Sequence, residues 1–274
     1  MEKIQRKKAK KILIIGNMSS GKSTLINSIL KENILPTSNQ ACTAKEIKIT
    51  VSNKRRFFSY YIGEKRRSLK KEGSLKVSTL NNSSEISKIE IIGPSYFREL
   101  EGYEIYDSPG PNNSIDIKHK DTTLNILKNG EFERVIFVFN AGNLFTIDDK
   151  ILLETLLKEK YGIRKEIVVV VNKMDKIHIS EESTDEEVTT KVKDFLKKIG
   201  IKKYKVFLYS SVYFCLKKNV EKNKSEKRFL NLLEEIYDKN KIKELKQIRK
   251  KIFLKEERSV KRRENTRNFK LYKI

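Results

Sequence analysis

The chain is poor in the residues that build disulfide frameworks and metal clusters. Its 274 residues include two cysteines and two histidines. Cys42 and Cys215 show neither disulfide nor metal-ligand spacing. No cysteine or pair of acidic residues stands at ligand spacing beside His119 or His178. This usage is typical of a reducing compartment, so we expect a cytoplasmic protein.

Long apolar runs are also missing. No segment approaches the roughly 20 residues needed to cross a bilayer. The N-terminal sequence MEKIQRKKAKKILIIG has a basic segment and then only a short apolar stretch, which favours a buried strand over a signal peptide. We therefore expect any contact with a membrane to be peripheral.

Negative charge is in deficit. Sixty Lys and Arg stand against 36 Asp and Glu, which gives a net charge of +24. Such a balance attracts anions, including nucleic acid, acidic lipid headgroups and nucleotide phosphates. Lys, Ile and Asn also dominate throughout, as they do when a genome is poor in G and C. Two explanations of the positive charge therefore stay open: it reflects the composition of the genome, or it forms a dedicated binding face.

Short apolar runs alternate with helical patterns along most of the chain. This alternation predicts an α/β fold with a mostly parallel sheet flanked by helices. The predicted buried strands cover residues 11–15, 135–139, 167–171 and 206–209, and the predicted helices cover residues 22–30, 147–159 and 184–199.

An insertion interrupts this pattern. Residues 46–62 alternate as EIKITV, a basic turn at 53–56 and FFSYYI, which predicts an inserted β-hairpin. Residues 63–85 are polar and predict a long loop with one weak strand. Strands are also expected at 86–92 and 103–106. From Glu226 onward the pattern becomes helical and strongly basic.

One motif points to phosphate binding. Residues 16–23, GNMSSGKS, match G-x-x-x-x-G-K-[ST] between a predicted strand and a predicted helix. Backbone N–H groups of such a loop wrap phosphates, and the helix directs its positive end to the same place. Lys22 should reach the β- and γ-phosphates, and the Ser23 hydroxyl should ligate Mg²⁺. The predicted nucleotide contacts here are Asn17, Met18, Ser19, Ser20, Gly21, Lys22, Ser23 and Thr24.

A second motif, D-S-P-G, directly follows the predicted strand EIY. Its first residue, Asp107, is placed to hold Mg²⁺ through water. The N–H group of Gly110 is placed to sense the γ-phosphate.

A third motif, N-K-x-D at residues 172–175, follows the run EIVVVV. Asp175 would accept both N–H donors of guanine, whereas adenine has no matching pair of donors. Asn172 would contact the base and brace the loop, and the stem of Lys173 would cover the base plane. Ser210 and Ser211, after the strand VFL, stand where a backbone N–H would meet guanine O6.

A threonine between the phosphate-binding helix and the next strand can close over the γ-phosphate and Mg²⁺. Thr43, within LPTSNQACTA, is the preferred residue because it lies close to the strand. Thr37 is the rival.

These motifs, in this order and spacing, resemble the dynamin superfamily and specifically its bacterial branch. The resemblance rests on IIGNMSSGKSTLINSIL, LPTSNQACTA, IYDSPGPNNS and VVVVNKMD, and it covers roughly residues 10–215. Two features are more specific than a generic GTPase. They are the Ser19-Ser20 pair before Gly21 and the long insertion between Thr43 and Asp107.

The resemblance implies a GTPase that dimerises head to head through its nucleotide face. It would hydrolyse GTP to GDP and phosphate without a separate activating protein. Ser19 would help to fix a monovalent cation or a charge-compensating group. Members of the family often carry Gln or Arg at the position of Met18. A Met side chain can neither orient water nor neutralise charge, as those residues can. The implied catalytic residues are Ser19, Lys22, Thr43 and Gly110, and the implied Mg²⁺ ligands are Ser23, Thr43 and Asp107.

The resemblance also implies a division of the chain and a set of partners. A GTPase domain would cover residues 1–222, and a basic helical extension at 223–274 would be the start of a stalk or bundle. The implied partners are a second copy, an acidic membrane surface or a second dynamin-like chain. The tail at 246–273 is a candidate for acidic lipid or nucleic acid, and equally for the exposed face of a truncated stalk helix.

Two alternatives belong to other classes of protein. One is an RNA- or ribosome-binding GTPase that uses its basic surface. It is less favoured because no recognisable RNA-binding module is present. The other is a weakly hydrolysing scaffold whose GTP-bound form recruits a partner, and Met18 is its best support.

Overall fold

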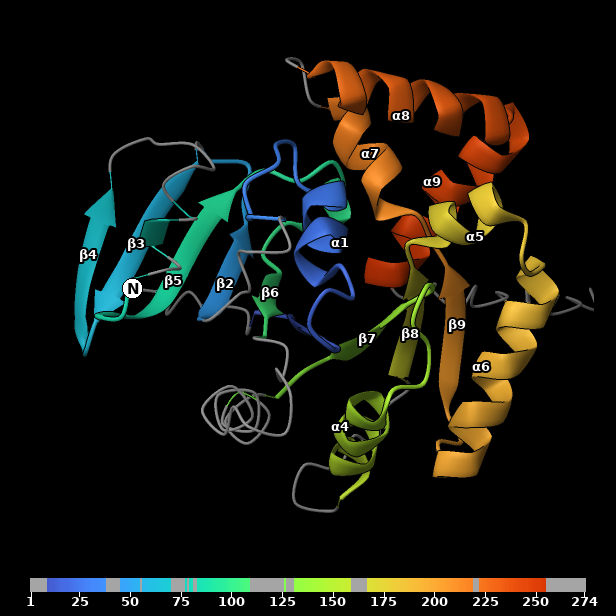
Figure 1. The fold of residues 1–274 in the computed structure, drawn as a ribbon. Coiled ribbons are helices and arrows are strands. Elements are labelled where there is room, and N and C mark those ends of the chain that lie inside the picture. Colours follow the sequence, from blue (N-terminus) through green and yellow to red (C-terminus); the bar gives the residue numbers. More distant parts are fainter. Residues whose placement is uncertain are drawn as a thin grey trace, which may run out of the picture.

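A sheet of nine strands runs through the centre of the part of the molecule that the structure describes (Figure 1). The structure is a computed structural model, and it describes residues 9–37, 45–54, 56–69, 77, 79–80, 83–108, 126, 131–158, 167–218 and 222–254. The strand order is β4-β3-β5-β2-β6-β1-β7-β8-β9. The strands are β1 (Lys11–Ile15), β2 (Glu46–Val51), β3 (Phe57–Ile62), β4 (Lys65–Leu69), β5 (Ile86–Gly93), β6 (Glu104–Asp107), β7 (Arg134–Asn140), β8 (Ile167–Asn172) and β9 (Tyr204–Leu208). The helices are α1 (Lys22–Ile29), α4 (Ile147–Leu157), α5 (Met174–Ser180), α6 (Asp185–Ile199), α7 (Ser211–Lys218), α8 (Lys224–Ile236) and α9 (Lys239–Phe253), with a 3-10 turn at Arg98–Leu100.

The sheet is mixed but mostly parallel, as predicted. Strand β1 pairs in parallel with β6 on one side and β7 on the other, and β7, β8 and β9 continue in parallel. All six residues of β8 are buried, which is typical of a parallel strand covered on both faces. The predicted buried strands and the two helices expected between them are confirmed within a few residues.

Helices cover both faces of the sheet, so the fold has three layers. Strand β1 shows this directly, since Ile12 and Ile14 join one buried apolar cluster and Leu13 and Ile15 join the other. The first cluster takes residues from α1, α7, α8 and α9, and the second takes residues from α4, α5 and α6. In Figure 1, α7 and α8 lie above the sheet and α4 lies below it.

The predicted hairpin between β2 and β3 is wrong, because β5 lies between these two strands. Strand β5 pairs in parallel with β2 and antiparallel with β3. The connection after β2 crosses the end of β5 at Gly93, where Ser52 N–H donates to the Gly93 carbonyl at 2.9 Å. Gly93 has no side chain to obstruct Arg56 there. The hairpin of this region is instead β3–β4, which turns at Gly63 with φ 56°.

Helices α8 and α9 contribute apolar side chains to the same core as α1 and the sheet, rather than forming a separate bundle. Leu233, Tyr237, Leu245 and Ile252 are buried in the cluster that contains α1. The predicted boundary after residue 222 stays a prediction, but α8 and α9 share a core with the residues before it. Within the described ranges, no helix has the length and apolar content that crossing a bilayer requires.

Candidate nucleotide-binding site

The loop between β1 and α1 has backbone conformations that only glycine adopts easily. Gly16 has φ 151°, and a Cβ there would lie 2.3 Å from the Val138 carbonyl oxygen. Gly21 has φ 89°, and a Cβ there would lie 2.3 Å from Asn172 Nδ2. Strands β7 and β8 therefore approach the loop so closely that a side chain at either glycine would clash with them. Ser19, at φ 57°, is exposed at its tip.

Lys22 is folded back over this loop. Its side chain is 6% exposed, and Nζ donates to the carbonyls of Gly16 and Asn17 at 2.9 Å each. The ammonium group is thus held at the mouth of the loop, where the β- and γ-phosphates are expected.

Ser23 and Asp107, both predicted to hold Mg²⁺, meet at the end of β6. Ser23 Oγ donates to Asp107 Oδ2 at 2.9 Å. Asp107 is fully buried, and its Oδ1 has no hydrogen-bond partner. Burial raises the pKa of Asp107 to about 6, against the lowering effects of Lys22 and Ser23. An unpaired buried carboxylate oxygen beside a hydroxyl fits Mg²⁺, which prefers oxygen ligands.

Asn172 connects the phosphate loop to the base-reading loop. Its Nδ2 donates to the carbonyls of Ser20 and Gly21 at 3.2 Å each. Its Oδ1 accepts from the N–H of Ser211 at 3.1 Å and from the Ser211 hydroxyl at 2.8 Å. The amide is satisfied on both sides, so it fixes three segments of the chain relative to one another.

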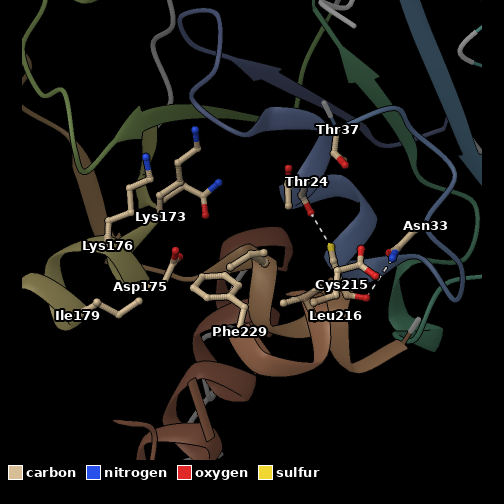
Figure 2. A pocket seen from close by; sticks show the side chains of 13 residues that line it. Thr24, Asn33, Thr37, Lys173, Asp175, Lys176, Ile179, Cys215, Leu216 and Phe229 are labelled. Carbon is tan, nitrogen blue, oxygen red and sulfur yellow. Dashed lines mark hydrogen bonds between the residues drawn. The ribbon is translucent and has the colours of Figure 1, made fainter. Parts of the chain in front are cut away.

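Asp175 lies on the wall of a cavity of about 610 Å³, together with Lys173 and Asn172 (Figure 2). Asp175 Oδ1 accepts from the buried Ser210 hydroxyl at 2.8 Å. Burial raises the pKa of Asp175, whereas the hydrogen bond from Ser210 and the nearby Lys173 lower it. A volume of this size is in the range of small-molecule sites.

The cavity has one basic side and one hydroxyl-bearing side. Figure 2 shows Lys173 and Lys176 on one side, Thr24 and Thr37 on the other, and Phe229 of α8 between them. Burial lowers the pKa of Lys173, and the neighbouring Lys176 adds to this effect. The Lys173 stem also passes near Gly21, at 3.7 Å from the position of an added Cβ.

Asn17 contacts a helix rather than the cavity. Its Nδ2 donates to Thr146 Oγ1 at 2.6 Å and to Asp149 Oδ1 at 2.8 Å. Thr146 and Asp149 form the capping box of α4, and Asp149 is 2% exposed. Burial raises the pKa of Asp149 to about 6. The side-chain donors of Asn17 are thus engaged, and any contact of this residue with phosphate falls to its main chain.

Of the remaining predicted residues, Ser20, Thr24 and Met18 lie in the described part of the chain, whereas Thr43 and Gly110 do not. Ser20 is 1% exposed, and its Oγ has no hydrogen-bond partner. Thr24 lies in the first turn of α1, and Met18 precedes Ser19 in the loop. Thr43 and Gly110 lie outside the described residues, so their roles stay predictions.

Sequence reasoning missed four contributors to this region. Thr146 and Asp149 could have been found from the pattern T-x-x-D after the strand VFN, which is typical of a helix start. Glu226 and Phe229 line the cavity from α8, 50 or more positions beyond the base-reading motif, and no local pattern indicates this.

Comparisons with known proteins identify the family of this chain. A family model for the dynamin family matches residues 12–174. A bacterial dynamin-like protein of Nostoc punctiforme is 24% identical over 183 residues, which is 62% of this chain and 25% of that protein. The chain therefore spans about a quarter of that relative's length.

Two solved structures share the fold. They show an oligomerised bacterial dynamin pair, described as providing a mechanism for the long-range sensing and tethering of membranes. Their TM-scores are 0.60 and 0.59 at 20% and 19% identity, over 92% of this chain and 41% of theirs. Because the family match covers more than half of the chain and includes the phosphate loop, Asp107 and Asn172, the chain belongs to the dynamin family and contains a GTPase domain of the bacterial dynamin-like kind.

Proposed function

We propose that this chain binds GTP with Mg²⁺, hydrolyses it to GDP and phosphate, and works as a nucleotide-dependent dimer. The observation that carries the proposal is the position of Asn172. One amide holds the carbonyls of Ser20 and Gly21 in the phosphate loop and also the start of α7 at Ser211. A phosphate cradle and a base reader are thereby held in one unit.

Guanine selectivity rests on Asp175. Its carboxylate lies at the cavity wall beside Lys173 and is oriented by Ser210. Guanine supplies two N–H donors to such a group. Adenine has no such pair of donors, so the buried carboxylate would gain neither contact, at a cost of about 1–3 kcal/mol.

Hydrolysis rests on positioning and on charge stabilisation. Lys22 would neutralise charge on the β- and γ-phosphates, and Ser23 with Asp107 would hold the Mg²⁺ that bridges them. We assign Thr43 and Gly110 to the closing of the site over the γ-phosphate. Ser19 is exposed at the loop tip and is suited to fixing a monovalent cation or a charge-compensating group.

The dimer and its place of action are also proposals. We expect two copies to meet through the face that carries the phosphate loop. The dynamin pair that shares this fold is described as tethering membranes. For this chain we propose peripheral action at an acidic membrane surface, alone or with a second dynamin-like chain.

The first test is GTP hydrolysis as a function of protein concentration, with molecular size followed by light scattering. We expect the rate per molecule to rise with concentration, GTP to drive dimers, and Lys22→Ala to abolish turnover. If the wild type binds GTP but hydrolyses it slowly and stays monomeric, activation by dimerisation is ruled out and a GTP-dependent scaffold is favoured.

A second measurement separates the membrane from RNA. Binding to acidic liposomes and to RNA is compared over a range of salt concentrations, because contacts with phosphate weaken steeply as salt rises. We expect binding to the liposomes. Tight binding to RNA alone would overturn the membrane proposal and favour an RNA-binding GTPase.

A further inference from the structure

Helix α8 supplies part of the wall of the base cavity. Its residues Glu226 and Phe229 line the same cavity as Asp175. They are three positions apart, so they lie on the same side of the helix. Leu230 and Leu233 are 8% and 0% exposed in the core, which fixes the rotation of α8 about its axis. Phe229 is only partly buried, so its ring keeps a surface that can face the cavity.

Hydrogen bonds hold α8 against the two helices that carry the base-reading residues. At the end of α8, the Tyr237 hydroxyl lies 3.1 Å from Nδ1 of His178 on α5. Within α8, Glu234 accepts a hydrogen bond from Lys217 of α7. Helix α5 contains the aspartate of the N-K-x-D motif, and α7 begins at the second of the two base-reading serines. The position of the Phe229 ring is therefore tied to both base-reading segments.

The side chains around Asp175 match the faces and one edge of a flat ligand. Asp175 is expected to pair with the N–H edge of guanine, so the plane of the base would pass through its carboxylate. The stem of Lys173 is expected to cover one face of the base. Figure 2 shows the Phe229 ring beside Asp175, on the side away from Lys173. An aromatic ring thus stands at the face that Lys173 leaves uncovered.

We propose that Phe229 stacks on the guanine base, on the face opposite Lys173, and is a binding residue for the nucleotide. The inference deepens the proposed function and rests on it. Every base has a π face that an aromatic ring can cover, so Phe229 adds affinity whereas Asp175 adds selectivity. Phe229 lies beyond the residues 12–174 that match the dynamin family model, so α8 completes a base site that begins within the match.

The chain contains no tryptophan, which permits a direct test of stacking. Phe229→Trp places a single indole at the proposed position, and its fluorescence is followed while GDP and Mg²⁺ are added to the 274-residue chain. We expect GDP to quench the emission, because a guanine base quenches an indole on contact. Inorganic pyrophosphate has no base and should leave the emission unchanged.

Ile236→Trp is the matched control for the fluorescence. Ile236 lies about two turns further along α8 and is partly buried against the same apolar cluster as Phe229. It lies outside the described lining of the base cavity. GDP should therefore leave the emission of Ile236→Trp unchanged.

Calorimetry measures how much the ring contributes to binding. We expect Phe229→Ala to lower the affinity for GDP about 10-fold or more, as when an aromatic ring is removed from beneath a base. The affinity for IDP, which lacks the 2-amino group, should fall by the same factor, because stacking involves the face of the base and not the edge that Asp175 reads. The affinity for pyrophosphate should stay at the wild-type value, and Ile236→Ala should keep all three affinities.

Three results would overturn the inference. The first is an equal loss of GDP and pyrophosphate binding in Phe229→Ala, which would show that the ring only supports the fold. The second is an emission of Phe229→Trp that does not change although calorimetry shows GDP to bind. The third is quenching by pyrophosphate as strong as that by GDP, which would report a general rearrangement of α8.

Two further measurements keep the result unambiguous. If Phe229→Ala does not fold, Phe229→Leu keeps an apolar side chain without a flat ring. It should still lower the affinity for GDP, and an unchanged affinity would count against stacking. Affinity for ADP is measured in parallel. A wild type that binds GDP no better than ADP removes the proposed function, whereas a wild type that prefers GDP, beside an unquenched Phe229→Trp, removes only the role of Phe229.

Discussion

The side-chain amide of Asn17 lies 2.8 Å from the carboxylate of Asp149, which follows it by 132 positions in the sequence. The second residue of the phosphate loop is thus held by the first turn of α4. Thr146 completes the arrangement, because its hydroxyl accepts from Asn17 and from the N–H of Asp149. The same hydroxyl therefore starts a helix and positions a binding loop.

Replacing Thr146 by Ala should weaken both functions of its hydroxyl. We expect a loss of about 1 kcal/mol in the free energy of unfolding, as for other N-caps. We also expect GTP affinity to fall about 3- to 10-fold, since Asn17 loses an acceptor. Thr184→Ala is the matched control, because Thr184 caps α6 with the same kind of box and has no contact with the loop among its described hydrogen bonds. Equal GTP affinities in the two variants would show that the contact with Asn17 is incidental.

Gly21→Ala should abolish nucleotide binding. The added Cβ would lie 2.3 Å from Asn172 Nδ2, so Asn172 would have to leave the carbonyls of Ser20 and Gly21. Gly200 has almost the same φ, 92° against 89°, but nothing lies within 4 Å of an added Cβ. Gly200→Ala thus measures backbone strain alone, about 1–2 kcal/mol. Calorimetry with GDP and chemical denaturation separate the two effects, and retained GDP binding in Gly21→Ala would contradict the close contact.

Asp107→Asn should stabilise the protein in the absence of Mg²⁺ and nucleotide. The Asp107 carboxyl has a pKa of about 6 when folded and an ordinary value of 3.8. The folded state therefore binds more protons between these values, and stability falls as pH rises through this window. Asn removes that cost, so the free energy of unfolding at pH 7.5 should rise by about 2–3 kcal/mol.

Two controls accompany the Asp107→Asn measurement. The difference in stability should close near pH 4, where the wild-type carboxyl is protonated in the folded state and approaches protonation in the unfolded state. Mg²⁺-dependent binding of GTP should meanwhile be lost. A variant that is less stable than wild type at pH 7.5 would show that Asp107 is stabilised by its surroundings rather than held there for a ligand.

A chain that ends at residue 222 should fail to fold as a stable domain. It would lack Leu233, Tyr237 and Ile252, all of which are almost completely buried in the cluster around α1. Each large apolar side chain lost from a core costs about 2–5 kcal/mol. Thermal unfolding followed by circular dichroism compares this shortened chain with the 274-residue chain. A cooperative transition and normal GDP binding would instead support a domain boundary after residue 222.

Local patterns were enough to predict much of this site. The strings GNMSSGKS and NKMD contain adjacent residues whose roles follow from a strand, a loop and a helix in immediate succession. The contact between Ser23 and Asp107 also follows from sequence, because both residues stand at the same edge of a parallel sheet.

Other features depend on which distant segments meet. The strand β2 alternates in the same way whether its neighbour is β3 or β5, so the sequence could not indicate that β5 separates them. The hydrogen bond between His178 and Tyr237 joins α5 to the end of α8 through tertiary packing. Neither residue stands in a pattern that names its partner.

Arg134 also anchors the end of α9 at one edge of the sheet. Arg134, the first residue of β7, donates to the carbonyls of Lys251, Ile252 and Leu254 at 2.7, 2.7 and 3.0 Å. Because β7 runs parallel to β1, Arg134 lies at the edge of the sheet opposite the phosphate loop. Two copies joined at their nucleotide faces would thus hold the two Leu254 residues at opposite poles of the pair. In such a pair the combined depth of two domains would separate the two α9 ends, so the pair would act as a spacer between them.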